Sequence, residues 1–152
     1  MNHVLIIVIT NSKKDSDFMD ELLFILRGRG MEYRGYCISA IRETGRLLTL
    51  LQELEVCSKR KIIITISRMG CSLPHLVTCH SRFPVIFYPS SSSPPSSPDR
   101  MITFQFQPVS PLMIVFGQEN LLSVCERLIH FSIPPMSSTG GKWDPKGLHQ
   151  IG

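Results

Sequence analysis

Seven residues near the amino end of the chain, Val4–Thr10, form an almost unbroken apolar run, and the polar stretch Asn11–Asp15 follows at once. A short apolar run bounded by polar turn residues is typical of a strand buried on both faces. Apolar residues then recur at helical spacing (Met19, Leu22, Leu23 and Leu26) until Gly28 and Gly30, which favour a helix end. Strand, polar loop and helix make the first unit of an open parallel α/β sheet.

The same alternation continues along the chain. The strands expected after the first are residues 32–39, 62–66, 85–88 and 112–116, with an exposed one at 101–106. The further helices expected are residues 46–56, with Leu47, Leu48, Leu51 and Leu54 as the core stripe, a helix from Leu73-Pro74 that ends by Arg82, and residues 119–129. Short right-handed crossovers then imply a three-layer α/β sandwich on a parallel, flavodoxin-like sheet.

The length of 152 residues and a hydrophobic content of 43% suit one domain with one core. We place this domain at residues 1–131. Within it, residues 89–99 are rich in Ser and Pro and predict a flexible loop. Residues 132–152 predict an irregular tail whose anchor is Trp143.

The net charge of +4 is mild. The basic cluster Lys59-Arg60-Lys61 is interpreted as the solvated end of a helix, not as a nucleic-acid site. No run is long enough to span a membrane, and the apolar amino end lacks the features of a signal peptide, so we expect a cytoplasmic protein. The five cysteines, irregularly spaced, are then expected to be reduced thiols.

Two constellations could carry chemistry. Ligands of open α/β sheets bind beyond the carboxyl ends of the strands, so Asn11–Asp15 lies where an anion could meet a helix N-terminus. Taken alone, this loop is more simply explained by capping of that helix by Ser12 and Asp15, which are residue types preferred at that position. Cys71, His75 and Cys79 recur at four-residue intervals, but we expect no metal, because Cys71 precedes the helix that carries the other two. No dinucleotide or Walker loop is present, and no cofactor is expected.

Four segments in order resemble motifs of the PurE family, the carboxylase or mutase that acts on aminoimidazole ribonucleotides in purine synthesis. Asn11–Asp15 is similar to a family loop that reads Gly-Ser-x-Ser-Asp, and Ser39–Arg42 to Ser-Ala-His-Arg. Gly70–Pro74 is similar to a loop that ends in His-Leu-Pro-Gly, and Phe83–Ile86 with Pro89 to a Pro-Val-Ile strand followed by proline. The resemblance covers residues 4–89 well and residues 100–130 weakly.

The resemblance implies that Ser12, Asp15, Ser39 and Arg42 hold the phosphate and ribose of a phosphorylated ribonucleotide or similar sugar phosphate. Ser72, at the position of a family histidine, is a further substrate-binding candidate. The resemblance also implies a homo-oligomer with sites built at subunit contacts.

The departures from the family pattern concern catalysis. Ile41 occupies the position of the histidine that carries the proton in the family, and isoleucine cannot carry one. Three interpretations stay open. The chain is a divergent, catalytically impaired PurE-like protein that binds a ribonucleotide, or an active carboxylase or mutase with His75 as a substitute base, or a partner-binding module with a vestigial pocket.

Overall fold

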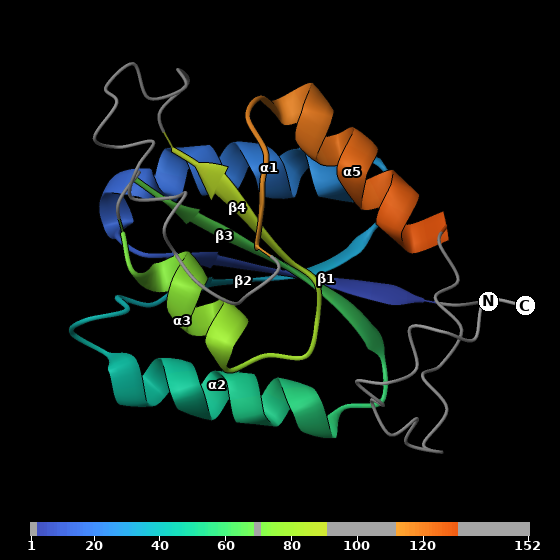
Figure 1. Cartoon of the computed structure of the whole chain (residues 1–152). Coiled ribbons are helices and arrows are strands. Elements are labelled where there is room, and N and C mark those ends of the chain that lie inside the picture. The colour runs from blue at the N-terminus through green and yellow to red at the C-terminus, as the bar shows by residue number, and fades with distance from the viewer. Residues whose placement is uncertain (1–2, 69–70, 91–111, 131–152) are drawn as a thin grey trace, which may run out of the picture.

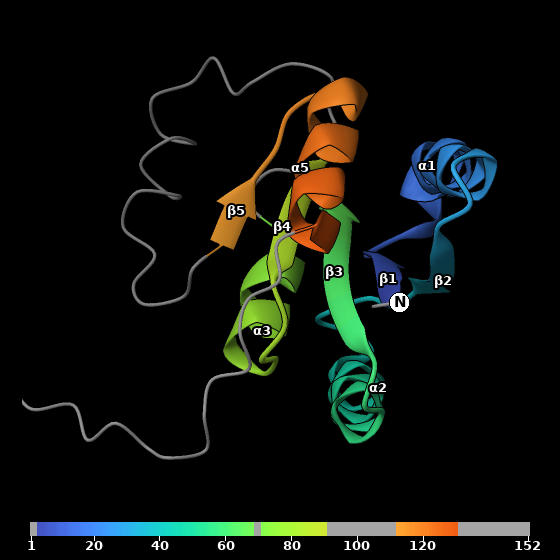
Figure 2. The same cartoon turned by 90° about the vertical axis from the view of Figure 1, so that its right-hand side faces the viewer.

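A computed structural model describes residues 3–68, 71–90 and 112–130. Five parallel strands form one sheet in the order β2-β1-β3-β4-β5 (Figures 1 and 2). The strands are β1 (Val4–Thr10), β2 (Glu32–Cys37), β3 (Arg60–Ser67), β4 (Val85–Pro89) and β5 (Leu112–Ile114). The helices are α1 (Ser16–Gly28), α2 (Thr44–Val56), α3 (Leu73–Cys79) and α5 (Gln118–His130), with a short 3-10 helix, η1 (Lys13–Asp15), before α1. This is the flavodoxin-like, three-layer α/β architecture that the sequence predicts.

The two inner strands β1 and β3 make the centre of the core. Every residue of β1 is buried, and so is every residue of β3 except its first. The two strands pair in parallel from Val4 opposite Arg60 to Thr10 opposite Ile66. Branched apolar side chains suit such a strand because both of its faces are covered by helices.

The helices form one layer on each face of the sheet (Figure 2). One core joins α1 and α5 to the sheet through buried side chains such as Leu22, Leu26 and Leu121. The other joins α2 and α3 through Leu47 and Val77, among others. None of the described helices is long and apolar enough to cross a membrane.

Several details differ from the sequence-based expectations. Strand β2 ends at Cys37, two residues early, and the buried stripe of α2 uses Leu50 where Leu48 was expected. Residues 112–116 were expected to form a buried strand. This expectation is wrong for Met113, which is 43% exposed because β5 is an edge strand. The expected strand at 101–106, the tract 91–99 and the tail with Trp143 lie outside the described residues.

The basic cluster does not form the solvated end of a helix. Lys59 follows α2, while Arg60 and Lys61 begin β3, and Lys61 is only 2% exposed. The Lys61 ammonium stays buried because its Nζ donates hydrogen bonds to two carbonyl oxygens, those of Cys57 at 2.7 Å and Lys59 at 2.8 Å. Lys59 itself pairs with Glu32 at 2.9 Å.

Candidate functional site

The loops that follow β1 and β2 lie side by side at the carboxyl edge of the sheet. The parallel ladder brings them together, because Ile38 N–H donates to Thr10 O at 2.9 Å and Asn11 N–H donates to Ile66 O at 3.1 Å. The loop after β1 is therefore central, between the loop after β2 and the end of β3. This is the edge where ligands bind in open α/β sheets.

The side chain of Asn11 joins the first two loops. Its Oδ1 accepts a hydrogen bond from the backbone N–H of Ala40 at 3.0 Å, in a partly buried position. Sequence patterns alone do not assign this contact to Asn11. One feature of the sequence could have indicated this contact. The family motif has glycine at this position, and glycine has no side chain, whereas Asn11 has an amide that can accept a hydrogen bond.

Ser12 and Asp15 act differently from each other. Ser12 caps the short helix η1, since its Oγ accepts from the N–H of Lys14 at 3.0 Å. Asp15 is 8% exposed, and its carboxylate makes no capping hydrogen bond to α1. Capping thus accounts for Ser12, as the simpler interpretation of this loop held, whereas it does not account for the Asp15 carboxylate.

The second loop presents Arg42 to solvent. Ser39 Oγ accepts from the backbone N–H of Arg42 at 3.3 Å, which holds the turn. In the part of the chain that the structure describes, Arg42 forms no ion pair, because the neighbouring Glu43 pairs with Arg46 at 2.9 Å. Ile41, beside it, is 81% exposed.

Two buried hydroxyl groups flank the third loop, which follows β3: Ser67 is the last residue of β3, and Ser72 directly precedes α3. Ser67 Oγ and Ser72 Oγ have no hydrogen-bond partner among the described residues. Ser72 precedes α3 without capping it through its side chain, and Ser67 O accepts from the N–H of Ser90 at 2.9 Å. A buried hydroxyl without a partner costs about 1–3 kcal/mol, so a polar group brought to either of them would be stabilised.

His75 lies in the first half of α3 and is partly buried. Burial lowers its pKa below the usual value, so the neutral imidazole dominates at neutral pH. A neutral imidazole can accept a proton, as a substitute base must.

Cys71 lies just before α3, and Cys79 is the last residue of that helix. Within residues 3–68, 71–90 and 112–130, no three His, Cys, Asp or Glu side chains gather closely enough to hold a metal ion. Cys71 is partly buried and Cys79 is exposed, and both are free thiols.

The fold and the edge together define a flavodoxin-like α/β protein whose first two strand loops form one candidate binding edge. The family model for AIR carboxylase matches residues 5–119, and the chain belongs to that family. Solved structures agree in fold. Treponema denticola PurE has a TM-score of 0.71 and 22% identity, covering 82% of this chain and 79% of that chain. A PurE2 substitution variant from the same organism has a TM-score of 0.72 and 21% identity, with coverages of 83% and 79%. A search of the curated proteins found no match.

We predict that Asn11→Ala uncouples the first two loops. The Ala40 N–H would lose its acceptor, which should lower the free energy of unfolding by about 1–2 kcal/mol. Hydrogen exchange at the Ala40 amide should accelerate at the same time. Asn120→Ala is the control, because Asn120 Nδ2 donates to Phe116 O at an exposed position and its loss should cost under about 0.5 kcal/mol. Unchanged exchange at Ala40 would show that the contact does not couple the loops.

Proposed function

We propose that this chain is a divergent AIR carboxylase family member that binds a phosphorylated ribonucleotide, or a similar sugar phosphate, but does not catalyse by the family mechanism. The observation that carries the proposal is the position of Arg42. Its guanidinium is exposed and forms no ion pair with a described residue, on a loop that Asn11 fixes beside Ser12 and Asp15.

The chemistry of these residues suits a sugar phosphate. An arginine guanidinium offers two parallel donors to phosphate oxygens, and the Ser39 hydroxyl lies in the same turn. Asp15 would repel a phosphate, so its carboxylate is assigned to the ribose hydroxyls as an acceptor. The unpartnered hydroxyl of Ser72 gives a further polar contact if the ligand reaches the third loop.

The loss of catalysis rests on Ile41. A positioned acid or base is worth about 10²–10⁴-fold in rate, and an isoleucine side chain supplies neither. Its 81% exposure also leaves it without a packing role in the described chain. The alternative is an active enzyme with His75 as base. Burial keeps that imidazole neutral, but the lowered pKa also makes it a weaker base, so this alternative has less support.

Ligand binding is tested by thermal unfolding with a ribonucleoside monophosphate. At a ligand concentration about a hundredfold above its dissociation constant, binding should add roughly 2.7 kcal/mol to the free energy of unfolding and raise the Tm. Arg42→Ala should remove most of that shift with little effect on the unliganded protein. Arg127→Ala removes the same charge from an exposed arginine of α5, outside the candidate binding loops, and it should keep the shift. If the ligand raised the Tm of both variants equally, Arg42 would not be part of the binding site.

Catalysis is tested by assay of the purified protein with aminoimidazole ribonucleotide and carboxyaminoimidazole ribonucleotide. We expect no conversion above the uncatalysed rate, because no proton carrier stands at position 41. Conversion that His75→Ala abolishes and Arg46→Ala preserves would instead establish the active enzyme with a relocated base.

Self-association is part of the same proposal. The family resemblance implies a homo-oligomer, and we place Ile41, which is 81% exposed beside the binding edge, at the contact between two copies of the chain. We therefore predict an oligomer at micromolar concentration in sedimentation experiments and a smaller species for Ile41→Asp. Val56→Asp is the matched control, since Val56 is 87% exposed at the far end of α2 and should leave the mass unchanged. A strictly monomeric wild-type protein would contradict this part of the proposal.

A further inference from the structure

The connections at the carboxyl edge leave the sheet toward two different faces. The chain passes from β1 to α1 on one face, whereas β2 leads to α2 and β3 leads to α3 on the other face (Figure 2). The loops after β2 and β3 therefore approach the same side of the sheet, with the end of β1 between them. The change of face between β1 and β3 marks the place where ligands of open α/β sheets bind.

Each of the two loops that share a side presents one arginine. Arg42 lies in the turn after β2, and the exposed Arg68 is the first residue after β3. A turn holds Arg68 in place, because its carbonyl oxygen accepts from the N–H of Cys71 at 3.2 Å. Neither arginine forms an ion pair with a described residue. Neighbouring strands lie about 4.8 Å apart, so the ends of β2 and β3 are separated by about 10 Å.

Two serine hydroxyls lie on the same side as these arginines. Ile63 packs in the core formed with α2 and α3, and Ser67, four residues further along β3, points toward the same face because side chains alternate along a strand. Ser72 directly precedes α3. The hydroxyls of both serines have no hydrogen-bond partner among the described residues. The third loop thus combines an exposed charge with hydroxyl groups that a polar group could satisfy.

The acids near these loops leave most of the positive charge in place. Glu43 is already engaged in the ion pair described above, and the carboxylate of Asp15 is assigned to ribose. Asp17 lies in the first turn of α1, on the connection that runs to the other face. The exposed Lys13 and Lys14 of η1 add two further charges. The edge as a whole therefore favours a ligand with more than one anionic group.

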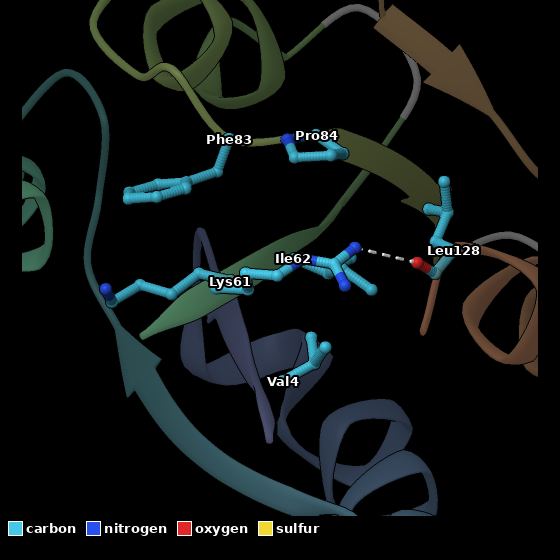
Figure 3. Close-up of a pocket in the computed structure, with 7 residues that line it drawn as sticks. Val4, Lys61, Ile62, Phe83, Pro84 and Leu128 are labelled. Atoms are coloured by element: carbon cyan, nitrogen blue, oxygen red, sulfur yellow. Dashed lines mark hydrogen bonds between the residues drawn. The ribbon is translucent and has the colours of Figure 1, made fainter. Parts of the chain in front are cut away.

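The cations at the opposite edge of the sheet are bonded to oxygen atoms of the chain itself. Arg60 Nη2 donates to Leu128 O at 3.3 Å, the bond drawn as a dashed line in Figure 3. Lys61 Nζ donates to the carbonyl oxygens of Cys57 and Lys59. These two cations differ in this respect from the arginines of the two carboxyl-edge loops.

We propose that the ribonucleotide at the carboxyl edge carries two separated phosphates, the 5′-phosphate on Arg42 and a second, on the ribose ring, on Arg68. This inference rests on the proposed function, which places the ribose at Asp15. The phosphates of a 5′-diphosphate are adjacent, so both would lie over one loop. Phosphates at the 5′ and 3′ positions leave from opposite faces of the ribose, so each can meet one guanidinium as a bidentate pair. The 2′-hydroxyl then remains for Asp15.

The test uses the full chain and isothermal titration calorimetry at one salt concentration, because screening weakens exposed charges. The probes are adenosine 3′,5′-bisphosphate, its isomer adenosine 5′-diphosphate, and adenosine 5′-monophosphate. The bisphosphate should bind about tenfold more tightly than the diphosphate, because only its second phosphate reaches Arg68. Arg68→Ala should remove most of that preference and leave the Kd of the monophosphate unchanged. Arg82→Ala removes an exposed arginine just before β4, at the other edge, and it should keep the preference.

The outcomes separate this inference from the function on which it rests. Equal binding of the two isomers, or a preference that persists in Arg68→Ala, would overturn the second phosphate, and the ribonucleotide proposal would stand if the monophosphate still binds. If none of the three nucleotides binds, both proposals fail. Arg68→Gln keeps a polar side chain in the turn and gives the same test if Arg68→Ala does not fold.

Discussion

The parallel pairing of β1 with β3 is the constraint on which the rest of the structure depends. Both strands are buried on both faces, so a one-residue slip would turn their side chains to the wrong layer. The register places Thr10 opposite Ile66 and leaves Asn11 N–H to bond Ile66 O. The strand register therefore fixes where the loop after β1 begins, and the sequence of the loop itself does not.

In the candidate site, ligand binding and proton transfer depend on different residues. The proposed binding groups lie on turns that hydrogen bonds hold, such as the turn closed by the bond from Arg42 N–H to Ser39 Oγ. By the resemblance to the family motif, the proton carrier would stand at the position of Ile41. A single replacement can remove the proton carrier while the turn stays intact. The Asn11 contact with Ala40 adds a support for that turn which glycine could not provide.

The sequence predicts most of the fold because the spacing of apolar residues along the chain shows which side chains are buried. The apolar run of β1 and the spacing of Leu22 and Leu26 were sufficient for strand and helix. Tertiary contacts explain what was missed. Lys61 looks like a surface residue until the carbonyl groups that end α2 are placed beside its Nζ. The Asn11 contact spans 29 residues, so local patterns could not reveal it. Ser12 and Arg42 were proposed as site residues through the family motifs, since their residue types alone also suit capping or a solvated surface.

The strands of the sheet are not equally well paired, and the pairing is weakest at β5. β5 pairs with β4 over only three residues, and it leads into α5, whose contact with the rest passes through side chains and the Arg60 bond to Leu128. Such a weakly paired end is where local unfolding usually starts. A brief opening of β5 and α5 would expose part of the core that α5 shares with α1. The loops after β1 and β2 would keep their backbone hydrogen bonds to β1 and β3, so the carboxyl edge can stay ordered while the β5 side of the sheet opens.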